Sequence, residues 1–171
     1  MKNPAAAELP FSPAADVCCL ICRIGGKMEK PKILLVDDED RFLGTMQKLI
    51  QRKGYDIHTA SGGTEALEKM LYADIDVVIL DVKMPGRDGI DILKEIKNRF
   101  PLIEVILLTG HATVESAIIG MRSGAYDYLM KPVAPDDLIQ KAESAFVRRK
   151  SIQEIKAKSK NSVKTAVPGN G

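Results

Sequence analysis

The stretch KILLVDDED, residues 32–40, decides the fold of this chain. Its first part, Ile33–Val36, is wholly apolar and ends directly at two acids, Asp37 and Asp38. A continuous apolar run of this length is typical of a strand that is buried on both faces of a parallel sheet. We therefore expect a central strand here, with two carboxylates at its carboxyl end.

The same pattern returns twice further along the chain. Residues 77–80 are apolar and are followed by Asp81, and residues 105–108 are apolar and are followed by Thr109. These two segments predict two more buried strands, each with a polar residue at its carboxyl end.

Weaker strand signals at residues 56–60 and 126–130 bring the expected number of strands to five. Gly54 and Gly124 lie where helix C-caps are expected. Five strands alternating with five helices predict a flavodoxin-like, doubly wound α/β domain of (βα)5 form, with a five-stranded parallel sheet in the order 2-1-3-4-5. The helices are predicted by apolar residues at helical spacing: Phe42, Met46, Leu49 and Ile50; Leu67, Met70 and Leu71; Ile90, Leu93 and Ile96; Val114, Ala117, Ile118 and Met121; and Leu138, Ala142, Ala145 and Phe146.

Charge is unevenly distributed along the 171 residues, which are enough for one domain. Residues 28–147 carry 15 Lys/Arg and 20 Asp/Glu, whereas residues 148–171 carry seven basic residues and one acid. An acidic body argues against direct nucleic-acid binding. We assign the domain to residues 28–149, and interpret residues 150–171 as a helical extension and a flexible, solvated basic tail.

The N-terminal part has no helical or strand period, and we predict that residues 1–27 are a disordered leader. Its three cysteines, Cys18, Cys19 and Cys22, contain one CxxC without further ligands nearby, so we expect no zinc site. Met28 resembles a natural start, and a mass measurement on the native protein would test the hypothesis that the chain begins there. No bilayer-spanning run or secretory signal is evident, which predicts a cytoplasmic protein without a membrane partner.

The carboxyl ends of parallel strands lie along one rim, where open α/β sheets bind ligands. The predicted strand order brings five polar groups to that rim: Asp37, Asp38, Asp81, Thr109 and Lys131. Three neighbouring carboxylates repel one another, and a shared Mg²⁺ would relieve the repulsion. One carboxylate could then attack phosphorus, with the lysine and the hydroxyl binding phosphoryl oxygens.

The next two acids, Glu39 and Asp40, receive a simpler interpretation. They stand directly before a helical pattern, where acids often cap a helix or remain solvated. We therefore leave both out of the predicted site.

Four stretches resemble the bacterial response-regulator receiver domain in order and spacing: ILLVDDED, VVILDVKMPGRDGIDIL, VILLTGHATVESAI and GAYDYLMKPV. The similarity covers about residues 32–149, and the last two stretches most resemble receivers attached to sigma-54-dependent transcription activators. It implies a two-component phosphorelay domain that accepts a phosphoryl group from a sensor histidine kinase, with Mg²⁺ as cofactor. Such a domain is not a conventional enzyme, because it catalyses only its own phosphorylation and dephosphorylation.

The resemblance also implies the roles of individual residues. Asp81 would be the phosphoacceptor, and Lys131 would form an ion pair with the phosphoryl group. Asp38 would bind Mg²⁺ directly and Asp37 largely through water. Asp81 and the backbone carbonyl of Lys83 would complete the protein ligands.

Further implied residues concern switching. Thr109 would follow the phosphoryl group, and the ring of Tyr128 would then move inward. Lys83 and His111 would tune how long the phosphoryl group survives, and the Lys131–Pro132 bond would be cis. Without the resemblance, Tyr128 would be interpreted as a packing residue of the core or of the partly exposed surface. His111 would then be as consistent with a solvated loop residue as with a functional one. The output face would be the fourth helix, fifth strand and fifth helix, which could also form a homodimer; the downstream target is unknown.

Two other functions are consistent with parts of the sequence. A haloacid-dehalogenase-type phosphatase also has an Asp nucleophile, but it needs a second Asp two residues later, where this chain has Lys83. A pseudo-receiver would bind partners without phosphorylation, but the complete set of acids, threonine and lysine argues against it. No GxxxxGK[ST] loop occurs, and residues after Phe146 leave no room for a helix-turn-helix module. The chain is therefore either a single-domain regulator or a receiver from a longer protein.

Overall fold

The computed structural model describes residues 29–110 and 114–164. The predictions for the leader and its cysteines, for His111 and for the last seven residues therefore lie outside the described residues. The elements alternate strictly along the chain: β1 Ile33–Val36, α2 Asp40–Arg52, β2 Ile57–Ala60, α3 Gly63–Tyr72, β3 Val77–Asp81, α4 Gly89–Arg99, β4 Glu104–Thr109, α5 Val114–Arg122, β5 Asp127–Met130 and α6 Pro135–Lys164.

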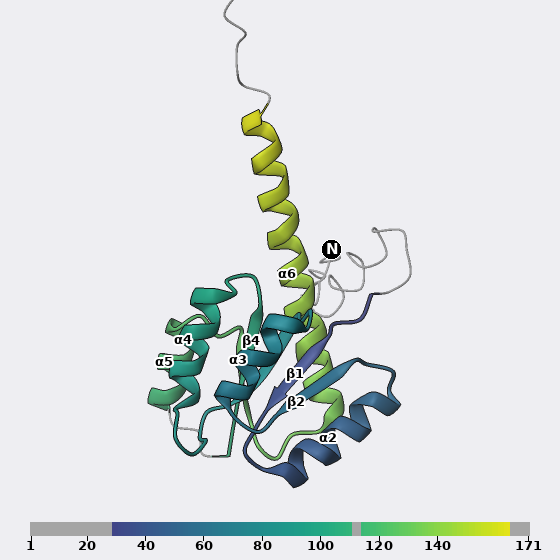
Figure 1. The fold of residues 1–171 in the computed structure, drawn as a ribbon, viewed down its shortest axis with the longest axis vertical. Coiled ribbons are helices and arrows are strands. Elements are labelled where there is room, and N and C mark those ends of the chain that lie inside the picture. Colours follow the sequence, from purple (N-terminus) through teal and green to yellow (C-terminus); the bar gives the residue numbers. More distant parts are fainter. Residues whose placement is uncertain (1–28, 111–113, 165–171) are drawn as a thin grey trace, which may run out of the picture.

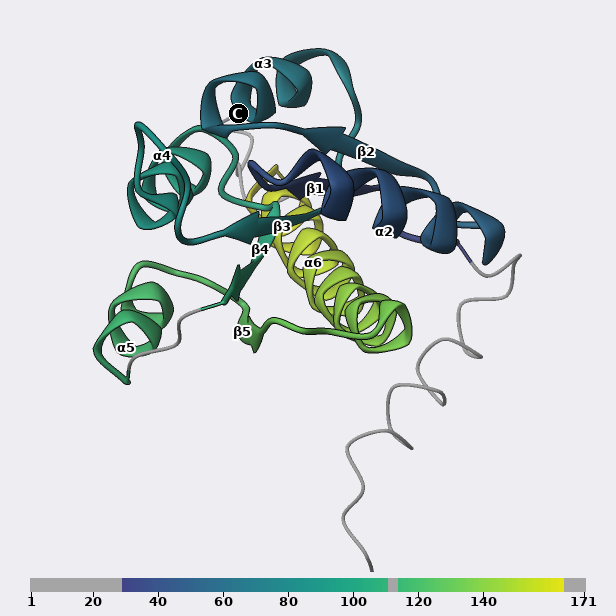
Figure 2. The same cartoon turned by 90° about the horizontal axis from the view of Figure 1, so that it is seen from below.

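The five strands form one parallel sheet in the order β2-β1-β3-β4-β5 (Figures 1 and 2). The predicted doubly wound fold and its strand order are confirmed. In the register of the sheet, Val36 of β1 stands beside Leu80 of β3, and Thr109 of β4 stands beside Met130 of β5. The carboxyl ends of these strands therefore meet along one rim, as the site prediction requires.

Helices cover both faces of the sheet, which explains why its central strands are wholly apolar. Successive side chains of a strand point to opposite faces. Accordingly, Leu34 and Val36 pack on the side of α3 and α4, whereas Ile33 and Leu35 pack on the side of α2 and α6. Figure 2 shows the two helical layers, with α5 beside α4.

Two of the helix ends are made by the glycines that the sequence indicated. Gly54 follows α2 with a φ of 79°, and Gly124 follows α5 with a φ of 97°. A residue other than glycine is strained at such a positive φ, which is why glycine commonly occupies this position after a helix.

The last helix, α6, has two parts with different surroundings. Its first part is buried against the sheet through Leu138, Ala142 and Ala145. Its second part continues to Lys164 and projects beyond the sheet (Figure 1). The division between a domain ending at residue 149 and a separate extension remains a prediction. None of the helices in the described ranges is long and apolar enough to cross a membrane.

Candidate functional site

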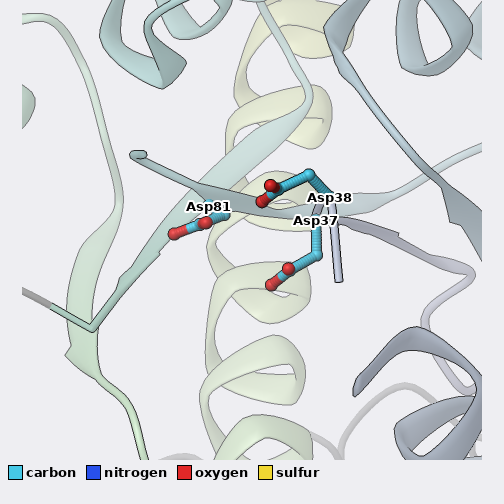
Figure 3. A group of neighbouring side chains, drawn as sticks. All are labelled: Asp37, Asp38 and Asp81. Atoms are coloured by element: carbon cyan, nitrogen blue, oxygen red, sulfur yellow. The ribbon is translucent and has the colours of Figure 1, made fainter. Parts of the chain in front are cut away.

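Three aspartates gather at the carboxyl rim of the sheet (Figure 3). Asp37 and Asp38 follow β1 directly, and Asp81 is the last residue of β3. Carboxylate oxygens from the three side chains all lie within 4.8 Å of one another. Asp37 and Asp81 are buried, whereas Asp38 is exposed, so the cluster is open to solvent from one side.

Asp37 is held in place by both of its carboxylate oxygens. Oδ1 accepts a hydrogen bond of 2.9 Å from the backbone N–H of Glu39. Oδ2 lies 2.6 Å from Nζ of Lys131, a close ion-pair contact. Two opposite charges at this separation attract each other in any orientation. Asp37 thus links the ends of β1 and β5.

Asp81 is buried as the last residue of β3. Its Oδ1 atom is buried and has no hydrogen-bond partner among the described residues. Burial raises the pKa of Asp81, and the nearby charge of Asp37 adds to the increase. Lys131 and the backbone N–H groups of Lys83 and Val82 act in the opposite direction without cancelling it. The ionised carboxylate is therefore short of positive charge and of donors.

Lys131 supplies the positive charge at this rim. It follows β5 directly, and its backbone N–H donates to the Thr109 carbonyl at 2.7 Å. The peptide bond to Pro132 is cis, as predicted. Its Nζ lies 3.7 Å from Asp81 Oδ2. Burial by itself lowers the pKa of Lys131, but the surrounding carboxylates outweigh that effect and raise it, so the side chain carries a proton.

The donor set fits a hard divalent cation. Such ions prefer carboxylate and carbonyl oxygens, and Mg²⁺ in particular binds one or two carboxylates and retains water. Asp81 offers an oxygen that no described residue hydrogen-bonds, and Asp38 offers an exposed carboxylate beside it. A groove next to the cluster is lined by Asp38 and by residues 82–88, which include the predicted ligand Lys83.

The predicted switch residues, Thr109 and Tyr128, lie in the neighbouring strands β4 and β5. Thr109 is fully buried at the end of β4. Tyr128 in β5 is partly buried against the core, and its hydroxyl lies 3.1 Å from the Ser116 hydroxyl in α5. Lys83 is exposed in the loop after β3. Of the predicted site residues, His111 alone lies outside the described ranges.

The structure adds one residue that the sequence interpretation set aside. Glu39 occupies the N-cap position of α2, but its side chain makes no capping hydrogen bond. Its Oε1 atom instead lies 3.3 Å from Nζ of Lys131. The sequence feature that could have indicated this role is the position of Glu39 directly after the paired acids that follow a buried strand. Asp40, in contrast, lies exposed in the first turn of α2.

A doubly wound parallel sheet with three acids and a lysine along its carboxyl rim defines a class of signalling domain. The model of the response regulator receiver domain matches residues 33–143, well over half of the chain. The chain therefore belongs to the response regulator receiver family, whose members are the receiver domains of two-component response regulators.

Individual relatives agree with this assignment. A putative NtrX-like response regulator of Rickettsia bellii (strain RML369-C) is 36% identical over 141 residues, which is 81% of this chain but 30% of that protein. A receiver domain structure from Clostridium thermocellum has a TM-score of 0.67 and 43% identity, and the match covers 71% of this chain and 98% of that one. A solution structure of the beryllofluoride-activated NtrC4 receiver domain dimer has a TM-score of 0.65 and 32% identity. The match covers 69% of this chain and 98% of that one. The predicted similarity to receivers of sigma-54-dependent activators is confirmed.

Proposed function

We propose that this domain accepts a phosphoryl group on Asp81 from the phosphohistidine of a sensor histidine kinase. The observation that carries the proposal is the state of the Asp81 carboxylate. The carboxylate lies at the end of a buried strand; one oxygen has no hydrogen-bond partner within residues 29–110 and 114–164, and the other lies 3.7 Å from the Lys131 ammonium group. An ionised carboxylate in that position is a nucleophile with an adjacent positive charge.

The chemical step is a displacement at phosphorus. A carboxylate oxygen of Asp81 attacks, the bond from phosphorus to the kinase imidazole nitrogen breaks, and the electron pair leaves with that nitrogen. The product is an acyl phosphate, which water later hydrolyses. Catalysis by the domain is thus limited to its own phosphorylation and dephosphorylation.

The cofactor of the proposed reaction is Mg²⁺. Asp38, Asp81 and the backbone carbonyl of Lys83 would hold it directly, and Asp37 largely through water. When bound, the ion supplies positive charge that offsets the repulsion among the carboxylates and the phosphoryl oxygens. Lys131 binds one phosphoryl oxygen, and the hydroxyl of Thr109 donates to another.

The proposed readout is a change of the surface formed by α5, β5 and α6. Movement of Thr109 toward the phosphoryl group leaves room for the Tyr128 ring, which must then give up its contact with Ser116. Five large apolar side chains lie exposed on the described parts of these three elements: Ile118, Ile119, Met121, Met130 and Ile155. They favour this surface as the site of a homodimer or of an output partner that is not yet identified, with the cytoplasm as the proposed compartment.

Two residues are proposed to tune the lifetime of the phosphorylated form, namely Lys83 and His111. Both stand two positions after a proposed site residue and could screen the attacking water. We expect Lys83→Ala and His111→Ala to change the rate of autodephosphorylation more than the affinity for Mg²⁺. Unchanged decay in both variants would remove this part of the proposal.

The test of the main proposal is incubation with acetyl phosphate and Mg²⁺, followed by intact-mass measurement. We expect one phosphoryl adduct per chain, which disappears in Asp81→Asn and in the presence of EDTA. Steady release of phosphate without an adduct would favour an Asp-based phosphatase. Absence of both adduct and turnover would favour a pseudo-receiver that binds partners independently of phosphorylation.

A further inference from the structure

The side chain of Glu39 has an unusual orientation for its place in the fold. The N-cap position normally carries Ser, Thr, Asp or Asn, whose side chain accepts a hydrogen bond from the first helical turn. Glu39 makes no such bond with α2. Its carboxylate reaches across the rim, and Lys131 donates to it at 3.3 Å. The side chain therefore contributes to the site and does not cap the helix.

Lys131 is shared among three carboxylates at unequal distances. Its Nζ lies 2.6 Å from Asp37, 3.3 Å from Glu39 and 3.7 Å from Asp81. The Phe42 ring, whose centroid lies 4.7 Å from Nζ, limits its freedom further. The two shortest contacts are thus with acids other than the proposed phosphoacceptor, and Asp81 lies beyond hydrogen-bonding distance.

The two competing acids differ in how easily they can release the lysine. Asp37 is completely buried, and its other oxygen is fixed by the backbone of Glu39. The Glu39 side chain is 65% exposed, so its carboxylate can exchange Lys131 for water at little cost. When Lys131 turns toward an oxygen near Asp81, the Glu39 contact is the one that breaks.

We propose that Glu39 is a positioning residue that competes with the incoming phosphoryl group for the Lys131 ammonium group. While Glu39 holds Lys131, phosphorylation of Asp81 by a small dianionic phosphodonor is slowed. The inference rests on the proposed function of Asp81, because it concerns the rate of the same reaction.

The experiment compares rate constants for phosphorylation by acetyl phosphate at saturating Mg²⁺. We expect Glu39→Gln to react about two- to fivefold faster than the wild type, the range set by the worth of an exposed ion pair. Glu39→Asp keeps the charge but withdraws it from Lys131 by one methylene, and it should also react faster. Asp40→Asn removes a charge one residue away without touching Lys131 and should react at the wild-type rate.

A double-mutant cycle identifies the route of the effect. Both substitutions are also made in a Lys131→Ala protein. There, Glu39→Gln should change the rate constant no more than Asp40→Asn does. The inference is overturned if Glu39→Gln and Asp40→Asn behave alike, if Glu39→Asp keeps the wild-type rate, or if the acceleration persists without Lys131. These outcomes all require a wild-type protein that becomes phosphorylated. A wild type that gains no phosphoryl group would overturn the proposed function of Asp81, and this inference with it.

Discussion

Gly89 lies so close to Asp81 that a β-carbon at position 89 would stand 2.2 Å from the Asp81 carbonyl oxygen. The same β-carbon would stand 2.8 Å from Cα of Val82. The Gly89 N–H also donates to the Val82 carbonyl at 3.0 Å. Because the obstacles are backbone atoms, a larger residue cannot be accommodated by a rotamer change. The start of α4 is thereby fixed against the end of β3, beside the proposed phosphoacceptor.

Substitution of this glycine should destabilise the protein. We expect Gly89→Ala to lower the free energy of unfolding by about 1–3 kcal/mol, the usual cost of forcing extra atoms into a packed site. It should also weaken Mg²⁺ binding, because the backbone of Asp81 and Lys83 must shift. Urea denaturation with and without Mg²⁺ measures both effects.

The matched control is Gly44→Ala in the interior of α2. A β-carbon there meets nothing within 4 Å, and alanine is a better helix former than glycine by up to about 1 kcal/mol. This variant should be as stable as the wild type or more stable. Equal losses in the two variants would contradict the role assigned to the close approach at Gly89.

The stability of the metal-free protein should depend on the ionisation of Asp81. Its pKa in the folded state is raised, chiefly by burial. The folded state therefore binds the proton more tightly than the unfolded state does, and stability falls as the pH rises from the unfolded pKa through the folded one. Asp81→Asn removes this penalty. In EDTA at neutral pH we expect the variant to be about 1–2 kcal/mol more stable than the wild type.

The pH dependence separates this effect from a change of packing. The advantage of Asp81→Asn should shrink as the pH falls through the folded pKa, where the wild-type carboxyl is itself neutral. Chemical denaturation at neutral and acidic pH gives the comparison. An Asn variant that is no more stable than the wild type at neutral pH, or an advantage independent of pH, would contradict the account given for Asp81.

The buried strands were predictable because their signal is local. Each apolar run, such as Ile33–Val36, is a sequence of residues that only a sheet covered on both faces can bury. The clustering of the acids could be predicted from the same topology, because the carboxyl ends of parallel strands meet along one rim. Strand boundaries were less accurate: β4 begins at Glu104, one residue before the predicted run. That residue joins the sheet because Val77 of β3 stands beside it, a relation that no local pattern contains.

Contacts between distant residues could not be predicted from the sequence. Glu39 and Lys131 are 92 positions apart, and the hydrogen bond between their side chains is visible only in the folded structure. The burial of one charge was not predicted either: the side chain of Arg149, the last residue of the predicted domain, is only 12% exposed. A charged side chain is buried when an opposite charge pairs with it, and here the acid, Asp76, lies in the loop before β3.

Binding of Mg²⁺ should stabilise the wild type and depend on Asp38. A ligand that binds only the folded state raises the free energy of unfolding by an amount that increases with its concentration. At about ten times the dissociation constant this gain is roughly 1.4 kcal/mol. We expect Asp38→Asn to lose most of it, since the exposed carboxylate would be a direct ligand. Asp40→Asn should keep it, and a similar loss in both variants in thermal unfolding would contradict the assignment.

At the opposite, amino-terminal end of the strands, α6 is attached by the ion pair between Arg149 and Asp76, the residue directly before β3. Asp76 is buried, its Oδ2 accepts the backbone N–H of Lys32 at 2.9 Å, and its Oδ1 contacts the Arg149 guanidinium group. Removal of the guanidinium leaves a buried carboxylate without its counter-charge, which typically costs 3–5 kcal/mol. Since both side chains keep some exposure, we expect Arg149→Ala to lose about 3 kcal/mol. Arg148→Ala is the control: its side chain is 54% exposed and lies 3.5 Å from Glu104, so a loss under about 1 kcal/mol is expected.

Hydrogen exchange distinguishes attachment of α6 from a general loss of stability. If Arg149 fixes the helix to the sheet, the amides of α6 that follow it should exchange faster in Arg149→Ala than the loss of global stability explains, while those of β1 and β3 should lose protection only by the amount of that global loss. The extension of α6 projects beyond the sheet (Figure 1). Equal destabilisation by Arg149→Ala and Arg148→Ala, with unchanged exchange in α6, would mean that apolar packing of the first half of the helix determines its position alone.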